Sequence, residues 1–479
     1  MSVFENKKRG VIITFIMERY DIVIIGSGPG GYVSAIRAAQ RGAKVAVIER
    51  NEVGGVCLNR GCIPTKALLA CVEALRTAER LSEFGIAMEG ELKPDISAMH
   101  TRMKKVVDTL VKGIGGLFRA NKVTLLRGDG VIVAKDRVQI SEDRKKFEVQ
   151  ADRIVIATGS RPAVFPMLEA DGKRILDSDH ILKYDKVPSS ILIVGAGPIG
   201  CEWACLFSSL GSQVIVVEMM GRVLPMEDEE MSQILEREFK KQKIKVKTGV
   251  KIAKLLKEPN KVKAELDDGE TVEAEIVLVS IGRARNTDNI GLENIGIKVN
   301  NTGAIEVNDK METSVDGIYA IGDVVPTPML AHVASAEGIV AVVNATGGDA
   351  RMDYSAVPSC IFTYPEVAGV GMREWELKKN GLSYKVGRFD MRALGKAHAS
   401  GEIVGRVKVI TDEDDRVIGV HIVGKSAPEL IHEGVVALRN KLTVEQVLNS
   451  IHAHPTFSEA LVEALDDLRG EAIHAQPRR

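Results

Sequence analysis

The sequence contains little cysteine and almost no net charge, and each shortage excludes a class of protein. Only 6 of its 479 residues are cysteine, too few for the disulfide framework of a small secreted protein. We therefore expect a reducing, cytoplasmic environment, where a disulfide is more often catalytic than structural. The 64 Lys and Arg residues are balanced by 65 Asp and Glu residues. This balance gives no electrostatic reason to expect binding to nucleic acid or to an anionic membrane.

A long apolar segment is also missing from the N-terminal region, where a membrane or targeting signal would lie. A basic stretch, Lys7 to Arg9, precedes a short apolar run from Val11 to Met17. That run is far shorter than the roughly 20 residues that cross a bilayer, and no small-residue cleavage site follows it. We expect no membrane segment here. We interpret residues 1–16 as a dispensable N-terminal extension, with translation beginning at Met17.

The chain is long and rich in apolar residues and glycine. Its 479 residues exceed what one ordinary core accommodates, so we expect two to four domains. A hydrophobic content of 45% with 27% charged residues is typical of a globular protein. The 45 glycines fit repeated strand-turn-helix units.

The first such unit begins at Tyr20. An apolar run is followed by a glycine turn, a helical pattern and a second apolar run that ends in an acid: Tyr20 to Ile25, then Gly26, Gly28 and Gly31, then Tyr32 to Arg41, Lys44 to Ile48, and Glu49. This order is the full context of the dinucleotide-binding fingerprint. Its glycines let the backbone approach a pyrophosphate, and the acid can accept hydrogen bonds from ribose hydroxyls.

The same unit recurs from Ser190. Its parts are Ser190 to Val194, then Gly195, Gly197 and Gly200, then Gln213 to Val217, and Glu218. The interval from Gly200 to Glu218 equals that from Gly31 to Glu49. Two dinucleotide folds imply two bound nucleotides, and the economical interpretation is electron transfer between FAD and a nicotinamide dinucleotide. The acid at Glu218 favours NAD because it would repel the 2′-phosphate of NADP, although Arg222 lies nearby.

Two cysteines, Cys57 and Cys62, lie just downstream of the first fingerprint. Five positions along an undistorted helix span roughly 7.5 Å. A disulfide needs Cα atoms about 4.4–6.8 Å apart. A bridge would therefore require a bent or locally unwound helix, and Gly61 and Pro64 could supply the bend. Two unrelated buried thiols are the alternative interpretation.

The remaining segments give a coarse map of the chain. Helical patterns and then apolar runs lie between the two fingerprints: Ala67 to Arg80, Ser97 to Ala120, Val123 to Val133, Arg137 to Gln150, and Arg153 to Ala157. From about Ser355 the pattern predicts an antiparallel sheet followed by helices: Val357 to Thr363, Lys385 to Asp390, Gly405 to Thr411, Val417 to Val423, Glu429 to Asn440, Val444 to Leu448, and Ser458 to Leu468. This last part has no nucleotide signature, so we expect it to serve association.

The map predicts an α/β fold with two Rossmann-like dinucleotide-binding domains and a C-terminal α+β domain. The expected parts are a first FAD-binding part, an NAD-binding domain, a central part that returns to the FAD domain, and an interface domain: residues 17–158, 159–287, 288–354 and 355–479. The strand that ends at Asp323 places an acid where it can accept a hydrogen bond from a cofactor hydroxyl.

Taken in order, these features resemble the flavin-dependent pyridine nucleotide-disulfide oxidoreductases. Besides the two fingerprints, the motifs that carry the resemblance are Cys57 to Pro64, Ala157 to Ser160, Tyr319 to Asp323, Leu330 to His332, and His454 to Glu459. The resemblance runs from about Tyr20 to Leu468, and it is strongest to the members that oxidise dihydrolipoyl groups. One departure is Arg285, which stands where the family has a proline and puts the rigidity of that loop in doubt.

The resemblance implies a redox-active disulfide between Cys57 and Cys62. Cys57 would exchange with the substrate thiol, and Cys62 would face the flavin as the charge-transfer thiolate. The other FAD-site residues would be those of the first fingerprint together with Lys66, Gly130, Thr158, Gly159, Ser160, Asp323 and His332. Lys66 would be paired with Glu202. The NAD site would comprise the second fingerprint with Val250 and Gly282.

His454 is the candidate general base, and Glu459 is the carboxylate that would orient it. An imidazole titrates near neutral pH, and a hydrogen-bonded carboxylate raises its basicity. In the family the base reaches the disulfide of the partner subunit, so we expect a homodimer. His452 and His454 could instead suggest a metal pair, but no third ligand clusters nearby in the sequence, and we expect no metal.

We therefore expect an enzyme that oxidises protein-bound dihydrolipoyl groups with reduction of NAD⁺. The expected partners are lipoyl domains or lipoyl proteins of 2-oxo acid dehydrogenase or glycine cleavage complexes. One alternative is another disulfide or metal reductase of the family, such as glutathione or mercuric reductase. A mainly structural subunit of such a complex is the alternative from a different class.

Overall fold

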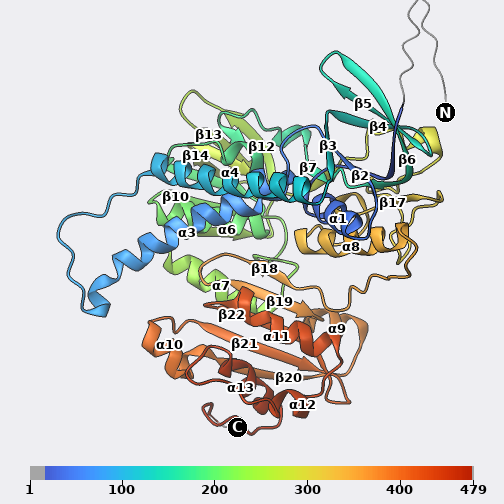
Figure 1. Ribbon diagram of the computed structural model, residues 1–479. Helices are drawn as coiled ribbons and strands as arrows, with labels where there is room; N and C mark the ends of the chain where they lie inside the picture. The colour runs from blue at the N-terminus through green and yellow to red at the C-terminus, as the bar shows by residue number, and fades with distance from the viewer. Residues whose placement is uncertain (1–16, 477–479) are drawn as a thin grey trace, which may run out of the picture. The chain divides into compact units, whose positions relative to one another are not determined.

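The computed structural model describes residues 17–476, so the expectation for residues 1–16 lies outside the described part (Figure 1). The chain divides into two compact units, which are described separately. The first combines the chain up to Ala67 with His100–Ala163 and Gly282–Asp353. The second combines Leu68–Met99 and Val164–Ile281 with the chain from Tyr354 onward.

A seven-stranded sheet with the path β3-β2-β1-β6-β5-β4 forms the centre of the first unit, and β17 pairs with β6 off this path. Strands β1, β2, β3, β6 and β17 run parallel, whereas β5 pairs antiparallel with both β4 and β6. The strands are β1 Glu18–Ile25, β2 Val45–Glu49, β3 Thr124–Arg127, β4 Asp129–Ala134, β5 Arg137–Glu142, β6 Lys145–Ile156 and β17 Ile318–Ala320. The paired strands β7 Ser160–Pro162 and β16 Arg283–Arg285 form a separate ribbon.

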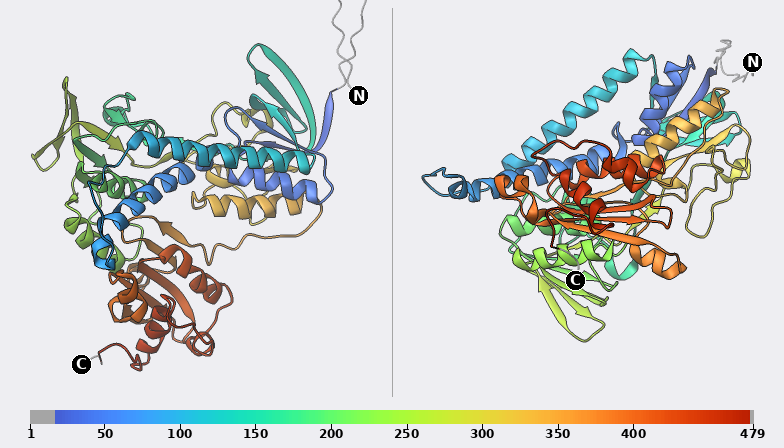
Figure 2. Two further views of the ribbon diagram at one scale, coloured as in Figure 1. Left: turned by 60° about the vertical axis from the view of Figure 1, so that its left-hand side comes forward. Right: turned by 90° about the horizontal axis from the view of Figure 1, so that it is seen from below.

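Two helices of this unit, α1 (Pro29–Gln40) and α8 (Ala331–Ala345), lie side by side (Figures 1 and 2). Their close approach depends on glycine, because a Cβ added at Gly30 would come within 3.1 Å of the Ala334 carbonyl oxygen. Strand β2 is buried along its whole length, so its apolar side chains fill the core on both faces. Three further helices begin or end in this unit: α2 Gly55–Arg60, α3 Cys62–Glu79 and α4 Ile96–Ala120.

The second unit contains a five-stranded parallel sheet in the order β11-β10-β9-β15-β8. A three-stranded antiparallel sheet, β12-β13-β14, follows it in the chain. The bounds are β8 Ile175–Leu176, α5 Ser178–Ile181, β9 Ser190–Val194, α6 Pro198–Ser209, β10 Gln213–Glu218, α7 Glu229–Lys241, β11 Lys245–Thr248, β12 Ile252–Lys257, β13 Val262–Leu266, β14 Thr271–Ala274 and β15 Ile276–Val279.

The C-terminal part of the second unit is an antiparallel sheet in the order β18-β19-β22-β21-β20, packed against helices. Helix α11 packs on β19 and β22, and α13 packs on β20 and β21. The bounds are β18 Ser359–Ile361, β19 Val367–Gly371, α9 Glu374–Asn380, β20 Lys385–Asp390, α10 Gly395–Ser400, β21 Gly405–Thr411, β22 Val417–Gly424, α11 Ala427–Arg439, α12 Val444–Leu448 and α13 Glu459–Asp467.

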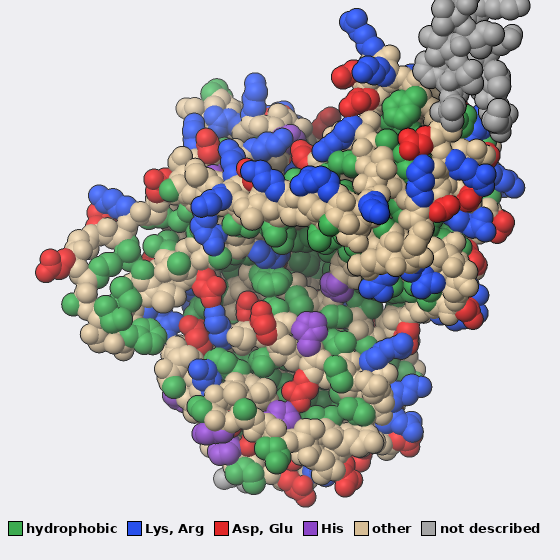
Figure 3. Space-filling view, in the orientation of Figure 1, with side chains coloured by type: hydrophobic (Ala, Val, Ile, Leu, Met, Phe, Trp, Pro, Cys, Tyr) green, Lys and Arg blue, Asp and Glu red, His purple; other side chains and the backbone are tan. Residues whose placement is uncertain are grey.

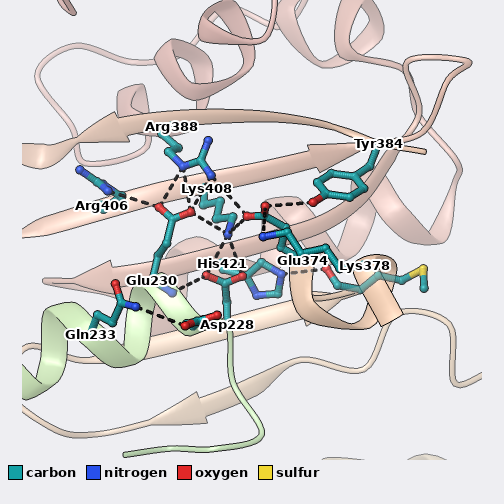
Figure 4. Close-up of polar contacts among 12 residues, drawn as sticks. Asp228, Glu230, Gln233, Glu374, Lys378, Tyr384, Arg388, Arg406, Lys408 and His421 are labelled. Carbon is teal, nitrogen blue, oxygen red and sulfur yellow. Dashed lines mark hydrogen bonds and ion pairs between the residues drawn. The ribbon is translucent and has the colours of Figure 1, made fainter. Parts of the chain in front are cut away.

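A buried lysine joins α7 to the C-terminal sheet within this unit (Figure 4). The Lys408 ammonium is 1% exposed and lies 2.9 Å from Asp228, 2.9 Å from Glu230 and 2.7 Å from Glu374. Arg388 approaches Glu230 from the neighbouring strand β20, and Arg406 from β21, the strand that carries Lys408. Each buried charge therefore has partners of opposite sign, as a buried ion cluster requires.

The predicted fold class is confirmed, and the elements differ from the sequence expectation in detail. The runs predicted at Arg137 to Gln150 and Arg153 to Ala157 divide differently, because β6 extends from Lys145 through to Ile156. The expectation missed the β12-β13-β14 sheet, strand β19 and helices α7, α9 and α10. Acidic and basic side chains are both spread over the face in Figure 3, in agreement with the balanced composition. No helix in residues 17–476 is long and apolar enough to cross a membrane.

Candidate functional site

The first glycine loop has the geometry that a dinucleotide needs. Gly26 has φ +104°, a conformation that side chains disfavour, and a Cβ added at Gly31 would overlap the Gly26 carbonyl oxygen. A Cβ at Gly28 would meet no atom within 4 Å. The loop is therefore closed toward the protein and open at Gly28, just before the N-terminus of α1. A pyrophosphate fits this open side, where the positive end of the helix dipole stabilises it.

Glu49, the acid at the end of β2, is buried and holds the same loop. One of its carboxylate oxygens accepts hydrogen bonds from the Ser27 N–H (2.9 Å) and the Ser27 hydroxyl (2.6 Å). The other accepts one from the Asn51 N–H (2.8 Å). A carboxylate offers about four lone-pair positions, so Glu49 retains capacity for a ribose hydroxyl.

The second loop has the same backbone geometry as the first. Gly195 has φ +100°, a Cβ at Gly200 would overlap the Gly195 carbonyl oxygen, and the space beside Gly197 is open. Glu218 accepts hydrogen bonds from the N–H groups of Ala196 and Met220, each at 2.7 Å. The two sequence fingerprints therefore fold into two matching nucleotide-binding loops.

The sequence left the choice between NAD and NADP open because of Arg222, and the side chain of this residue makes other contacts. Its guanidinium donates a hydrogen bond to the Pro225 carbonyl oxygen at 2.9 Å and lies 5.9 Å from the centre of the Trp375 ring. Val250, predicted at the NAD site, donates its N–H to the Glu218 carbonyl oxygen at 3.2 Å. The carboxylate beside the second loop therefore sets the charge there, and it favours NAD.

The two cysteines lie on either side of a helix break. Helix α2 ends at Arg60 and α3 begins at Cys62, with Gly61 between them at φ −147° and ψ −110°. The predicted distortion is confirmed, and it occurs at Gly61, whereas Pro64 lies inside the first turn of α3. The break brings the two side chains together: a hydrogen bond with Cys62, burial and the charge of Cys62 raise the pKa of the Cys57 thiol.

Lys66 and Tyr32 lie near Cys57. The Lys66 charge acts in the opposite direction on the pKa of Cys57 and favours its thiolate. Burial and then the charge of Cys57 raise the pKa of the Tyr32 phenol on α1. The cysteine pair thus adjoins the helix that begins at the first nucleotide loop. A pair of adjacent cysteines with a nearby cation is suited to thiol–disulfide exchange.

The turn at Thr158, Gly159 and Ser160 is held by residues far away in the sequence. Asn286 accepts a hydrogen bond from the Thr158 hydroxyl through its carbonyl oxygen (2.7 Å) and donates one to the Thr158 carbonyl oxygen (3.0 Å). Arg283 donates to the Ser160 hydroxyl at 2.6 Å, and that hydroxyl donates to Asp323. The structure thus brings Ser160 and Asp323 together, as a shared cofactor site requires.

Arg283, Asn286 and Glu337 support this cluster, and sequence reasoning did not identify their roles. The Glu337 carboxylate is fully buried and accepts hydrogen bonds from the Gly322 N–H (2.6 Å) and the Thr327 hydroxyl (2.7 Å). It therefore fixes the turn that carries Asp323. Its only sequence signal was an acid among apolar residues of α8.

Four more predicted residues have clear positions. His332 is the second residue of α8, and Gly130 lies in β4 with Ile25 and Ile48 close beside it. Gly282 has φ +129°, and a Cβ added there would meet no atom within 4 Å. Glu202, on α6, is buried and accepts a hydrogen bond from the Phe362 N–H at 3.1 Å.

Arg285, the departure from the family pattern, lies in a firmly held segment. It belongs to β16, where it pairs with Ser160. Its guanidinium donates to the carbonyl oxygens of Thr302 (3.0 Å) and Val325 (3.4 Å). These side-chain contacts hold the segment against the chain at Thr302 and Val325.

His454 and Glu459 form a hydrogen-bonded pair at the start of α13. The imidazole Nδ1 lies 2.8 Å from Glu459 Oε1, and the Thr456 N–H donates to Oε2 at 2.8 Å. Burial raises the pKa of Glu459, but the hydrogen bonds from His454 and Thr456 outweigh it, so the pKa of the carboxyl is lowered. The His454 side chain is 76% exposed, which leaves its second ring nitrogen open to a reactant.

His452 does not share a site with His454. Its Nδ1 lies 2.9 Å from the Ser450 carbonyl oxygen and its Nε2 lies 2.6 Å from Glu433 Oε1, so both nitrogens are engaged. Within residues 17–476, no three His, Cys, Asp or Glu side chains are grouped so as to hold a metal ion.

The fold and these sites define an oxidoreductase with two dinucleotide-binding folds and a paired-cysteine centre. Residues 20–338 match the family model for pyridine nucleotide-disulphide oxidoreductases, and residues 357–465 match the dimerisation domain of that family. The chain belongs to the pyridine nucleotide-disulphide oxidoreductase family.

Its relatives include proteins named dihydrolipoyl dehydrogenase. The Bacillus subtilis protein is 43% identical over 471 residues, which cover 95% of this chain and 99% of that protein. The Chlamydia muridarum protein is 40% identical, over 96% of this chain and 99% of its own length. A mitochondrial protein of Arabidopsis thaliana is 40% identical, over 95% of this chain and 91% of its own length.

Solved structures have the same fold. The crystal structure of LpdA from Mycobacterium tuberculosis matches with a TM-score of 0.88 and 28% identity, over 94% of this chain and 99% of that one. The HOCl-induced flavoprotein disulfide reductase RclA from Escherichia coli matches with a TM-score of 0.83 over 93% of this chain and 99% of that one. At 24% identity, that second likeness concerns the fold alone.

Proposed function

We propose that the chain acts as a dihydrolipoyl dehydrogenase, which oxidises protein-bound dihydrolipoyl groups to lipoyl groups and reduces NAD⁺ to NADH. The observation that carries the proposal is the Cys57–Cys62 pair, placed together by the break at Gly61 and adjoining the first nucleotide loop. The full-length relatives that bear this name support the choice of substrate.

The first nucleotide fold is assigned to FAD and the second to NAD. The FAD-site residues are the first glycine loop with Glu49, Lys66, Gly130, the turn at Thr158 to Ser160, Asp323 and His332. The NAD-site residues are the second loop with Glu218, Val250 and Gly282. When bound, the two cofactors carry the electron pair from the cysteine centre to solution. The supporting observation is the open space at Gly28 and Gly197, each before a helix N-terminus.

The reaction begins with the centre in its disulfide form. His454 takes the proton of one substrate thiol, and the resulting thiolate attacks the sulfur of Cys57. A mixed disulfide forms, the bond between Cys57 and Cys62 breaks, and Cys62 leaves as a thiolate. The second substrate thiol then attacks the substrate sulfur of the mixed disulfide, and its proton passes to the departing Cys57 sulfur. The lipoyl disulfide forms, Cys57 is released, and two electrons remain in the reduced cysteine pair.

Each element of the chain has a part in this proposal. Residues 17–158 and 288–354 form the FAD-binding part, 159–287 the NAD-binding part and 355–479 the interface domain. The chain forms a homodimer through that last domain, and His454 serves the disulfide of the partner subunit. Lipoyl domains or lipoyl proteins of 2-oxo acid dehydrogenase or glycine cleavage complexes are the macromolecular substrates. The cytoplasm supplies the reducing environment that free lipoyl thiols need.

Comparison of substrates tests the proposal. Dihydrolipoamide, reduced glutathione and reduced thioredoxin are each offered with NAD⁺ and with NADP⁺, and the reduced nucleotide is followed at 340 nm. We expect turnover with dihydrolipoamide and NAD⁺ that exceeds every other combination at least tenfold. A preference for glutathione or thioredoxin with NADP⁺ would assign the chain to a different disulfide reductase.

Cys62→Ser tests the electron route. The variant keeps FAD, measured by its absorbance, because Cys62 supplies a sulfur and no cofactor-holding group. Dihydrolipoamide oxidation is lost, by about 10³-fold or more, since no disulfide can form. Cys71→Ser, on the same helix outside the pair, is the matched control and keeps normal turnover. Normal turnover in Cys62→Ser would refute the proposed centre.

A further inference from the structure

The segment formed by residues 222–228 lies against the second nucleotide loop, within the second unit. The Leu224 N–H donates a hydrogen bond to the Ala196 carbonyl oxygen at 2.9 Å, and Ala196 lies between Gly195 and Gly197. Leu224 is 1% exposed and has φ +45°, a conformation that side chains disfavour. A residue keeps such a conformation only when the surrounding structure holds it. The contact with the loop therefore depends on what fixes Leu224.

The peptide backbone of Ala196 is held from two directions. Its N–H donates to Glu218 at 2.7 Å, a contact that comes from the end of β10 in the nucleotide fold itself. Its carbonyl oxygen accepts the Leu224 N–H and the thiol of Cys201 (3.3 Å). The Leu224 contact comes from the 222–228 segment, which makes further contacts outside the nucleotide fold. A shift of that segment would therefore reach the loop backbone.

Trp375 holds this segment from the C-terminal part of the same unit. It lies in α9, and its indole N–H donates to the Glu227 carbonyl oxygen at 3.3 Å. The Arg222 guanidinium lies 5.9 Å from the centre of the Trp375 ring, within the range of a cation–π contact. Trp375 thus contacts the segment on both sides of Leu224, which lies two residues after Arg222 and three before Glu227.

Two further contacts from the C-terminal sheet fix the end of the segment. Glu227 is 6% exposed, and its carboxylate accepts a hydrogen bond from the Ser359 hydroxyl at 2.9 Å. The next residue, Asp228, is bound by Lys408 (Figure 4). The segment is therefore tied to the nucleotide loop at Leu224 and to the C-terminal sheet at its end.

We propose that Trp375 is a positioning residue for NAD binding, and that it acts on the second nucleotide loop through the 222–228 segment. The inference rests on the assignment of that loop to NAD. The Glu227 N–H, beside the carbonyl that Trp375 binds, donates to the Leu224 carbonyl oxygen at 2.9 Å. Without the indole, Leu224 can leave its disfavoured conformation. The Ala196 carbonyl oxygen then loses a donor, and the loop is less well ordered for a pyrophosphate.

Binding of ADP-ribose to the FAD-loaded dimer tests the inference without turnover, because this part of NAD lacks the nicotinamide ring. Its Kd is measured by isothermal titration calorimetry. Trp375→Phe keeps a ring and removes the N–H, and Trp375→Leu removes both contacts. The matched control is Tyr384→Phe, which removes a hydrogen bond to Glu374 on the same helix (3.0 Å). FAD content, and the rate of flavin reduction by dihydrolipoamide without NAD⁺, are recorded in parallel.

In Trp375→Leu we expect the Kd for ADP-ribose to rise about 5- to 10-fold, since a hydrogen bond and a cation–π contact together have this net magnitude. In Trp375→Phe it should rise about 2- to 4-fold, and in Tyr384→Phe less than about 1.5-fold. FAD content and flavin reduction should keep their wild-type values in all three variants. A purely structural role of Trp375 would lower stability without this selective loss of affinity for ADP-ribose.

An unchanged Kd in folded Trp375→Leu overturns the inference, and so does an equal rise in Tyr384→Phe. Circular dichroism establishes folding. If Trp375→Leu does not fold, Trp375→Phe and Ser359→Ala, which removes the hydroxyl bound to Glu227, give the same test. If the Kd responds as expected but the wild-type protein does not oxidise dihydrolipoamide with NAD⁺, the proposed function fails and the inference stands. If turnover is normal and the Kd is fixed, the function stands and the inference fails.

Discussion

The carboxylate of Glu459 divides its two oxygens between His454 and the Thr456 backbone, so the imidazole it orients has one open nitrogen. In the proposed mechanism, this carboxylate would also stabilise the imidazolium that forms when His454 takes a proton. Its lowered pKa keeps it ionised throughout the neutral range.

Glu459→Gln tests this role. The amide oxygen can still accept a hydrogen bond, but the negative charge is gone, so the imidazolium is less stable. We expect kcat/KM for dihydrolipoamide to fall about 10- to 100-fold. Glu445→Gln, an acid in the first turn of α12, is the control and should change kcat/KM less than twofold. An equal effect in both variants would contradict the assignment of His454 as the base.

At the residue scale, features that depend on the spacing of nearby residues could be predicted from the sequence. Contacts between residues far apart in the chain could not. The Cys57–Cys62 spacing required a distorted helix, and the break at Gly61 is present. Asn286 could not be connected with Thr158 in advance, because the contact joins residues 128 positions apart. Glu337 was missed for a related reason, since only the fold shows that its carboxylate holds the Gly322 turn.

At the element scale, the Lys408 cluster fixes α7 to strands of the C-terminal sheet (Figure 4). Lys408→Met should destabilise the protein by about 3–5 kcal/mol, because it leaves buried carboxylates without their cation. Urea unfolding followed by circular dichroism measures the change. Lys378→Met removes an exposed partner of Glu374 and should cost less than about 1 kcal/mol. Equal costs would mean that the cluster does not depend on its buried cation.

The same cluster predicts an acid limit to stability. Burial alone would raise the pKa of Glu230 and of Glu374, but hydrogen bonds from Arg388 and Lys408, and from Lys408 and Lys378, lower each pKa from 4.5 to about 2. A carboxyl whose pKa is lowered in the folded state stabilises that state at any pH above its pKa in the unfolded chain. This contribution disappears as the pH falls through the pKa of the folded state. Tm should thus decline between pH 4.5 and 2. In Lys408→Met the decline should be shallower, and an unchanged slope would contradict this.

Elements were predictable where a motif or a strict pattern marked them. The two fingerprints fold as expected because the first and third glycines of each leave no room for a side chain. The β12-β13-β14 sheet was missed, since runs such as Ile252–Lys257 have exposed lysines and a weak alternation. Strand β19, Val367–Gly371, has almost fully buried side chains, and no periodicity distinguishes such a run from a buried helix segment.

At the scale of the whole molecule, the proposed active site needs two chains. A heterodimer of Cys57→Ser with His454→Gln, purified through two affinity tags, contains one site with an intact pair and an intact base. We expect about half of the wild-type turnover, although each homodimeric variant is inactive. Pairing Cys57→Ser with the double variant Cys57→Ser, His454→Gln is the control and should give no activity. An inactive test heterodimer would place the base and the disulfide in one chain.

Glu218 has a consequence for the engineering of cofactor choice. In the proposed NAD site its carboxylate would disfavour a 2′-phosphate, and it also ties the second glycine loop to the end of β10 through Ala196 and Met220. A single substitution of Glu218 that allows NADP to bind would therefore remove the hydrogen bonds that hold the loop, and both coenzymes require that loop. Selection for NADP use should return paired changes, one that admits the phosphate and another that restores the lost backbone contacts. A change of coenzyme preference at this loop would thus also require a change in the contacts that hold the loop.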